Sequence, residues 1–339
     1  MYWITRMETD AVSGALYRPN QIVADEAQKI GFKTINYHYA RDLFPTYEIM
    51  DFYIESWFGT VQAGDVVVLQ FPDRVYNYEY LPRVIGFLRK IPNVKLIAFI
   101  HDVPTYFAKD LDISDENRVK SDFWLEQLRR FDLLIVHNDS MLKRLQHDEV
   151  NVKMVSLGLF DFPHNIPMKN KELSKKIYIV SGRPLKKINE NVDLLIEIYG
   201  SDNEPAKSNI SYNGFKTEEE LLTQFDGGFG LVSLTGGINL ADDWNFYGTL
   251  NSPFKLSFYL AAGLPVIVGK DSAQAEYVTQ KNIGFAIDSF EELAEKIKHL
   301  TADEYVTMLK HVKPIQTALK NGNFTKLALL KAIHMLEVD

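Results

Sequence analysis

The sequence predicts an α/β protein built from two doubly wound domains, each a parallel sheet with helices on both faces. Segments 66–71 (VVVLQF) and 96–100 (LIAFI) are apolar at consecutive positions, which is typical of parallel strands covered on both faces. Amphipathic stretches of helical length separate such apolar runs. The 339 residues exceed what one hydrophobic core usually serves, so the length favours two domains.

Strands and helices alternate through the first half of the chain. We expect strands at 2–5, 34–37, 65–71, 94–100, 133–136 and 152–157. We expect helices at 20–30, 47–57, 80–91 and 117–131, and one more that follows the strand at 133–136. Asp139 or Ser140 is expected to cap that last helix, because short polar side chains accept hydrogen bonds from first-turn N–H groups.

The pattern breaks at residues 158–175, where two prolines, mixed charges and no periodicity predict a linker. A second alternating segment follows. Its expected strands are 176–180, 194–199, 210–213, 228–232, 265–268 and 284–286. Its expected helices are 217–225, 252–262, 274–279, 290–300, 303–320 and 325–338. The sequence therefore predicts two Rossmann-like domains that face each other across a cleft.

Composition narrows the class of protein. The chain contains no cysteine, which excludes disulfides and thiolate chemistry, and it begins without the basic start and apolar run of a secretory signal. No stretch is long and apolar enough to span a bilayer, so a cytoplasmic location is expected. A net charge of −8 argues against nucleic acid as a partner. A small anion needs only local positive charge, such as Arg183, Lys186 and Lys187 together.

Polar residues that directly follow a parallel strand are candidates for a site, because ligands bind beyond the carboxyl ends of such strands. His101 and Asp102 follow the strand expected at 94–100. This pair would suit a general base or a group that orients an acceptor. A histidine there could equally cap a loop carbonyl, so both interpretations stay open.

The start of the helix expected at 252–262 predicts an anion site. Ser252 would be the N-cap, and Pro253 would occupy the first helical position. Free N–H groups at a helix N-terminus bind phosphate, and Lys255 in the first turn adds a full positive charge. Further along the chain, Glu276 near the start of the next helix could accept hydrogen bonds from ribose hydroxyls. Any capped helix that precedes a strand has the same appearance, so a purely structural role stays open.

Motifs of one family occur at residues 99–104 (FIHDVP), 227–232 (GGFGLV), 253–268 (PFKLSFYLAAGLPVIV), Gly284-Phe285 and 323–325 (NFT). They resemble the bacterial glucosyltransferase 3 and galactofuranosyltransferase-like family, which includes enzymes that glycosylate surface adhesins. These motifs extend in order over almost the whole chain.

The resemblance implies a GT-B enzyme with an N-terminal acceptor-side domain at 1–160 and a nucleotide-sugar domain at 161–322. The last helix, 323–339, would return to the first domain. The implied reaction transfers a hexose (glucose, galactofuranose or N-acetylglucosamine) from a UDP-sugar to a saccharide acceptor on a surface glycan or glycoprotein. No metal or cofactor is expected, and the resemblance permits a homo-oligomer.

Carried over by position, Arg183 and Lys255 resemble the residues that contact the diphosphate in the family. The donor set would also include Ser252, Pro253 and Phe254. Tyr199 is similar to the aromatic that flanks the nucleotide base, and Glu276 stands where the family has an acidic residue.

Other interpretations remain. A non-catalytic subunit that binds an acceptor or a partner protein would share the fold and would not bind UDP. Asp242 and Asp243 could suggest a pair of metal-bridging carboxylates, but we interpret them as part of a loop. His101 or Asp102 would be the base if the reaction inverts configuration, and neither would need that role if it retains configuration.

Overall fold

The computed structural model describes residues 1–8, 17–38, 46–73, 78–107, 115–182, 185, 188, 192–200, 208–237 and 243–338, with the side chains of 115–121 and 243–245 excepted. The chain divides into two compact units. Unit 1 comprises Met1–Gly158 and Phe324–Asp339, and unit 2 comprises Leu159–Asn323.

Unit 1 contains a parallel six-stranded sheet with the order β2-β1-β3-β4-β5-β6. The strands are β1 (Tyr2–Glu8), β2 (Lys33–His38), β3 (Val66–Phe71), β4 (Lys95–Ile100), β5 (Leu133–Val136) and β6 (Lys153–Ser156). The helices are α1 (Arg18–Gln28), α2 (Tyr47–Phe58), α3 (Tyr80–Leu88), α4 (Asp115–Leu128), α5 (Asp139–His147) and α12 (Asn323–Val338), with a short 3-10 turn, η1, at Pro104–Tyr106. Every residue of β3 is buried, as expected for a strand between two helical layers.

Unit 2 contains a second parallel six-stranded sheet, with the order β12-β11-β10-β7-β8-β9. The strands are β7 (Glu172–Ser181), β8 (Leu195–Gly200), β9 (Ile210–Tyr212), β10 (Gly227–Leu231), β11 (Val266–Gly269) and β12 (Gly284–Ile287). The helices are α6 (Glu218–Gln224), α7 (Asp243–Gly248), α8 (Phe254–Ala261), α9 (Ala275–Gln280), α10 (Phe290–His299) and α11 (Ala302–Lys320). This strand order is that of the dinucleotide-binding Rossmann fold.

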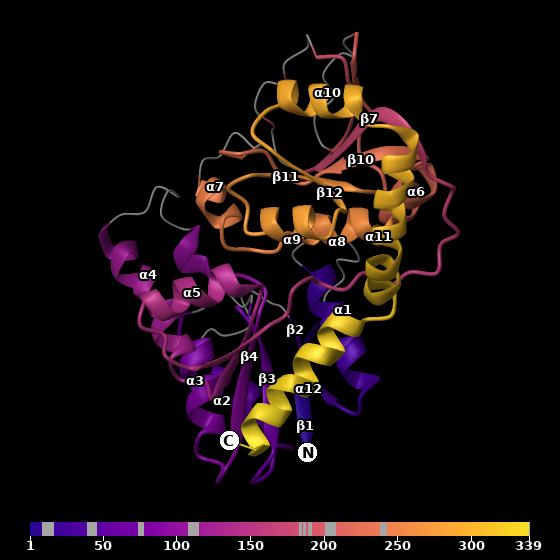
Figure 1. Ribbon diagram of the computed structural model, residues 1–339. Coiled ribbons are helices and arrows are strands. Elements are labelled where there is room, and N and C mark those ends of the chain that lie inside the picture. The colour runs from indigo at the N-terminus through magenta and orange to yellow at the C-terminus, as the bar shows by residue number, and fades with distance from the viewer. Residues whose placement is uncertain are drawn as a thin grey trace. The chain divides into compact units, whose positions relative to one another are not determined.

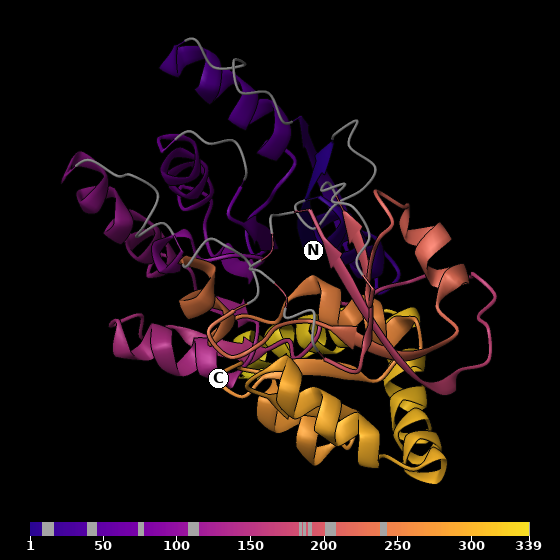
Figure 2. The same ribbon diagram turned by 90° about the horizontal axis from the view of Figure 1, so that it is seen from above.

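Alternate residues of the unit 2 strands pack against different helices. Ile177 and Phe229 share a buried cluster with Leu293 of α10. The neighbouring Tyr178 faces the other layer, where its ring lies 4.4 Å from that of Phe225, the C-cap of α6. Figure 1 shows α10 on one side of these strands and α8 and α9 on the other, and Figure 2 shows the salmon helix α6 and the gold helix α10 on different sides.

Helix α12 belongs to unit 1 although it is the last element of the chain. It lies beside β1, and both termini are at the same end of unit 1 (Figure 1). The Tyr2 hydroxyl donates a hydrogen bond of 2.6 Å to Glu337 Oε1. Buried Glu26 of α1 lies 3.0 Å from Lys326 Nζ. These contacts join segments more than 290 residues apart in the sequence.

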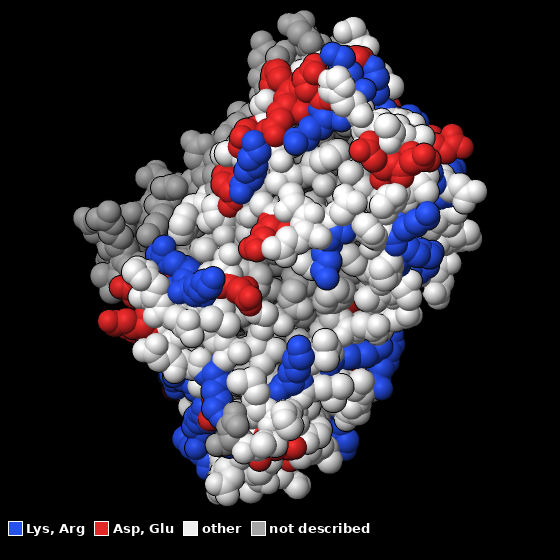
Figure 3. All heavy atoms as spheres, in the orientation of Figure 1, with Lys and Arg blue, Asp and Glu red and all other residues white. Residues whose placement is uncertain are grey.

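The face of the molecule drawn in Figure 3 is mixed in charge. On the face drawn in Figure 3, Lys and Arg side chains are interspersed with Asp and Glu side chains among the described residues. Helix α10 illustrates the pattern, with Glu292 3.7 Å from Lys296. Within the described ranges, no helix combines the length and apolar character that crossing a membrane would require.

Four local predictions were wrong. Asp243, which was expected in a loop, begins helix α7. Asn138, not Asp139 or Ser140, caps α5: its extended backbone puts Oδ1 3.0 Å from the Met141 N–H, and Asp139 is already in the first turn. Pro253 is the N-cap of α8 with extended dihedral angles, so the helix begins at Phe254 and Ser252 is not the cap. Strand β7 begins at Glu172, inside the predicted linker. The starts of α5 and α8 depend on a hydrogen bond and on dihedral angles within a few residues, whereas Glu172 joins β7 because it pairs with Gly227 of β10.

Candidate functional site

The carboxyl edge of the unit 2 sheet is the candidate donor site. Strand order reverses between β7 and β10, and ligands of open parallel sheets bind at such a reversal, outside the carboxyl ends of the strands. The ladder between β7 and β10 ends at the pair Tyr178 and Gly230, so the two strands separate beyond that point.

A tyrosine from α8 closes the opening between these two strands. The Val180 N–H donates a hydrogen bond of 2.8 Å to the Tyr259 hydroxyl. The ring of Tyr259 lies directly on Gly230, where an added Cβ would meet ring carbon Cγ at 2.1 Å. Tyr259 is fully buried, and burial raises the pKa of its hydroxyl. Gly230 thus permits the close approach of α8 to the sheet, and Tyr259 fixes it.

This contact positions the N-terminus of α8. Lys255 precedes Tyr259 by four residues, so the two side chains lie on the same face of the helix, one turn apart. Since α8 leads into β11, its N-terminus and Lys255 lie toward the carboxyl edge of the sheet. Pro253 at the N-cap has no side-chain oxygen to accept a hydrogen bond from the first-turn N–H groups.

A buried hydrogen bond joins the N-termini of α8 and α9. Gln274 Nε2 donates to Ser252 Oγ at 2.7 Å, and both side chains are buried. Glu276 follows two residues later, exposed in the first turn of α9, and its carboxylate accepts from Gln280 Nε2 at 2.7 Å. The structure therefore brings Ser252, Lys255 and Glu276 close to one helix pair.

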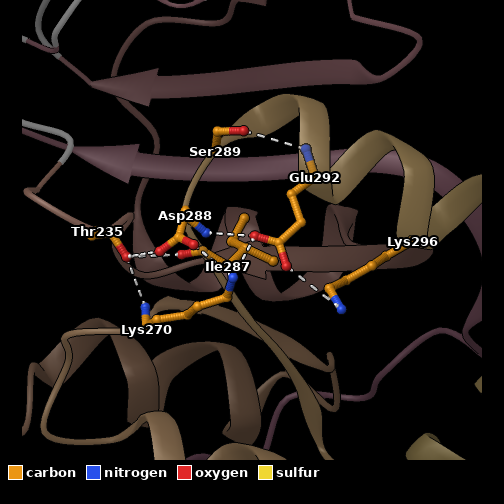
Figure 4. A network of polar contacts seen from close by, with 7 residues as sticks. All are labelled: Thr235, Lys270, Ile287, Asp288, Ser289, Glu292 and Lys296. Atoms are coloured by element: carbon orange, nitrogen blue, oxygen red, sulfur yellow. Dashed lines mark hydrogen bonds and ion pairs between the residues drawn. The ribbon is translucent and has the colours of Figure 1, made fainter.

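The loop that follows β10 is held by a polar network (Figure 4). Thr235 Oγ1 accepts from the Lys270 N–H at 3.0 Å and donates to Asp288 Oδ1 at 2.8 Å. Lys270 Nζ forms ion pairs with Asp288 at 2.6 Å and Glu292 at 3.0 Å. These contacts lower the pKa of both carboxyl groups. The first cause is the hydrogen bond from the Lys270 ammonium for Asp288, and the hydrogen bond from the Asp288 backbone N–H for Glu292. The loop after β10 is thereby tied to the loops after β11 and β12.

Tyr199 lies at the end of β8, paired in register with Val180. Only 6% of the residue is exposed, and burial is the first cause that raises the pKa of its hydroxyl to about 12. Its ring centroid lies 6.5 Å from that of Phe225. A ligand can therefore contact only a small part of Tyr199.

His101 lies at the carboxyl edge of the unit 1 sheet, directly after β4. It is 9% exposed, and its Nε2 lies 2.6 Å from Oε1 of Gln70 on β3. Its backbone oxygen accepts a hydrogen bond of 3.0 Å from His137 Nε2. Burial lowers the pKa of His137 to about 4, and the nearby Asp102 carboxylate opposes this shift. His137 is therefore neutral at pH 7.

Some expected residues lie outside the described part of the chain. These are Arg183, Lys186, Lys187 and Asp242, and the side chain of Asp243 is likewise outside it. Among the residues that the structure describes, no three His, Asp or Glu side chains are grouped so that they could hold a metal ion.

Sequence reasoning did not identify Gln70, Tyr259 or Gln274 as parts of these sites. Gln70 is the single polar residue in the run VVVLQF, which was an available signal, because a buried amide requires partners. Gln274 carried no comparable signal, since its partner Ser252 is 22 residues away.

Comparison with known proteins extends over both units. The glucosyltransferase 3-like N-terminal domain matches residues 1–159, and the glucosyltransferase 3-like C-terminal domain matches residues 180–332. The chain belongs to the glucosyltransferase 3-like family. This membership makes it a glycosyltransferase, as the motifs predicted.

Individual relatives agree with this assignment. Glucosyltransferase 3 of Streptococcus gordonii is 30% identical over 332 residues, covering 95% of this chain and 94% of the relative. The β-1,6-galactofuranosyltransferase WbbI of Escherichia coli K12 is 22% identical over 288 residues, covering 82% of each chain.

Two solved structures share the fold of this glucosyltransferase 3-like protein. Sucrose-phosphate synthase from Thermosynechococcus elongatus superposes with a TM-score of 0.65 and 12% identity, covering 99% of both chains. The E. coli trehalose-6-phosphate protein bound with UDP-2-fluoro glucose superposes with a TM-score of 0.60 and 10% identity, covering 98% of both chains. These similarities confirm the predicted GT-B fold class with two Rossmann-like domains.

Proposed function

We propose that this glycosyltransferase transfers a hexose from a UDP-sugar to a saccharide acceptor on a surface glycan or glycoprotein. Family membership and relatives named glucosyltransferase and galactofuranosyltransferase support the hexose. The UDP-2-fluoro glucose bound to a protein of the same fold supports the nucleotide.

The observation that carries the donor assignment is the hydrogen bond from Val180 to Tyr259 across Gly230. It supports a donor site in unit 2 because it places the start of α8 at the point where β7 and β10 separate. The N–H groups and dipole of α8 would stabilise a diphosphate there. Lys255 would add a full charge, and Arg183, two residues after β7, is proposed to add a second.

Charge stabilisation is the main catalytic effect in this proposal. An acceptor hydroxyl attacks the anomeric carbon of the sugar, the bond from that carbon to the diphosphate oxygen breaks, and UDP leaves. Negative charge grows on the diphosphate as the bond breaks, so the cations and the helix N-terminus act most strongly in the transition state. We expect this site to need no metal or other cofactor.

The remaining site residues have proposed roles at the nucleotide of the donor or at the acceptor hydroxyl. Glu276 would accept hydrogen bonds from the ribose hydroxyls, and Tyr199 would touch the base with its small exposed part. His101 or Asp102 would take the acceptor proton if configuration inverts. If configuration is retained, they would orient the acceptor, and the proton would pass to the diphosphate oxygen that leaves.

Thermal unfolding with UDP, ADP, GDP or no nucleotide tests the donor site. UDP at 100 times its dissociation constant should stabilise the protein by about 2.7 kcal/mol, and ADP and GDP should stabilise it less. Lys255→Ala and Arg183→Ala should each weaken the UDP shift, because each removes a charge from the diphosphate. EDTA should leave the shift unchanged.

Lys281→Ala is the matched control. Lys281 is an exposed lysine at the C-terminal end of α9, toward the opposite edge of the sheet, so the UDP shift should persist in this variant. Absence of a shift with every nucleotide would overturn the donor site and favour a non-catalytic subunit. A UDP-selective shift should be followed by transfer assays with UDP-glucose, UDP-galactofuranose and UDP-N-acetylglucosamine.

A further inference from the structure

Side chains replace backbone pairing where β1 and β3 separate in unit 1. The β1–β3 ladder ends at the pair Ile4 and Val68, and strand order reverses at this place in the sheet. Beyond it, the Gln70 N–H donates to Thr5 Oγ1 at 2.9 Å, and Gln70 Nε2 donates to the Thr5 backbone oxygen at 2.6 Å. Gln70 is thus built into the reversal point of the sheet.

The orientation of the Gln70 amide is determined by its surroundings. Its Nε2 donates to the backbone oxygens of Thr5, at 2.6 Å, and Asn20, at 3.0 Å, and so has an acceptor for each of its two hydrogens. The reversed orientation would place Oε1 against two carbonyl oxygens. Gln70 is 2% exposed, so water does not relieve such repulsion. Oε1 therefore faces His101.

This orientation decides which nitrogen of His101 carries a proton. Gln70 Oε1 only accepts hydrogen bonds, and His101 Nε2 lies 2.6 Å from it, so Nε2 must be the donor. A neutral His101 then has its lone pair on Nδ1. The backbone of His101 is also held, because its N–H donates to the Phe71 oxygen at 2.7 Å and its oxygen accepts from His137.

We propose that Gln70 is a positioning residue for sugar transfer: it holds the His101 ring and locks it in the Nε2–H tautomer, so that Nδ1 is the basic nitrogen of the ring. This assignment rests on the proposed function of His101. Gln70 acts only through His101, in the way that an oriented second group sets the tautomer of a catalytic histidine.

The tautomer is measured first, without any substrate. Imidazole ¹⁵N spectra of protein labelled on its eight histidines separate protonated from unprotonated nitrogens, and His101→Asn identifies the His101 signals. We expect protonated Nε2 and unprotonated Nδ1 in the native protein. Gln70→Met should abolish this preference. Gln70→Glu keeps an acceptor for Nε2, so Nε2 should stay protonated, but this variant loses the donor to the Thr5 and Asn20 oxygens and should be less stable.

Transfer kinetics are measured next on the same variants. Gln70→Met should reduce kcat about 10²-fold with a smaller change in KM, and His101→Asn combined with Gln70→Met should be no slower than His101→Asn alone. Gln127→Met is the control, because Gln127 is another buried glutamine of unit 1 and accepts from Arg130.

Three results would overturn the proposal. The first is Nδ1–H in the native protein. The second is a His101 tautomer that stays the same in Gln70→Met. The third is a kcat in Gln70→Met equal to that in Gln127→Met. A native protein that transfers no sugar would overturn the proposed function, and with it the role in transfer, while the spectra would still decide the tautomer.

Discussion

His137 shows how burial at a single residue makes stability depend on pH. It follows β5, is 2% exposed and donates from Nε2 to the His101 oxygen. Burial is the first cause that lowers its pKa to about 4 in the folded protein, whereas the unfolded chain has a histidine pKa of about 6.5. The unfolded state therefore takes up a proton at a higher pH than the folded state.

We expect stability to be full above about pH 6.5 and to fall as the pH drops toward 4, with a loss of about 3 kcal/mol from His137. Urea unfolding at pH 7, 6, 5 and 4 measures this slope. His137→Gln should flatten it, and His147→Gln, at an exposed position of α5, should not. His164, whose pKa is also lowered by burial, should leave a residual slope in both variants. An unchanged slope in His137→Gln would contradict the assignment.

Gly230 shows how one missing side chain decides the packing of two elements. The space that a Cβ would fill on β10 is occupied by the Tyr259 ring of α8. Gly230→Ala should therefore push α8 from the sheet and lower the free energy of unfolding by about 3 kcal/mol. Tyr259→Phe keeps the ring but removes the partner of the Val180 N–H, so a loss of about 1 to 2 kcal/mol is expected.

Urea unfolding in the absence of nucleotide measures both losses. Gly86→Ala is the control, because Gly86 lies within α3 and an added Cβ there meets nothing within 4 Å. This control should be neutral or slightly stabilising, since alanine reduces the freedom of the unfolded chain. If Gly230→Ala had the same free energy of unfolding as Gly86→Ala, the packing of α8 would not depend on this contact.

At the scale of the whole molecule, α12 belongs to unit 1 although more than 160 residues of unit 2 separate it from the rest of unit 1 in the sequence. The Glu26 side chain is 1% exposed and is shared by Lys326 of α12 and by Lys29, the C-cap of α1. Lys326→Met would leave this buried carboxylate with Lys29 alone, whose side chain is 56% exposed. Because Lys326 is itself partly exposed, we expect a moderate loss of about 2 kcal/mol.

Hydrogen exchange locates this loss within the molecule. Protection should fall in α1 and α12 of unit 1 and stay unchanged in unit 2, because the contact lies entirely within unit 1. Lys331→Met, at an exposed position of the same helix, should leave protection unchanged in both units. An equal loss of protection in unit 2 would show that the two units do not unfold separately.

Parts of the candidate site follow from sequence, and parts do not. Lys255 at the start of α8 and His101 after β4 could be predicted, because each position depends on where a helix or strand begins or ends. The partners of these residues could not. Ser252 looked like a helix cap, yet its hydroxyl accepts from Gln274, and His101 is oriented by Gln70 from the adjacent strand. Such pairs form only when the sheet brings distant segments together.

The sequence by itself determined the two α/β units, the alternation of helices and strands and most of their positions, because these features depend on apolar periodicity and on glycine and proline within a few residues. Only the tertiary structure decided the strand order, the contact of Tyr259 with Gly230 and the pairing of Glu26 with Lys326. The physical reason is that strand pairing and burial set these contacts between segments far apart in the chain, and local patterns contain no information about which segments will meet.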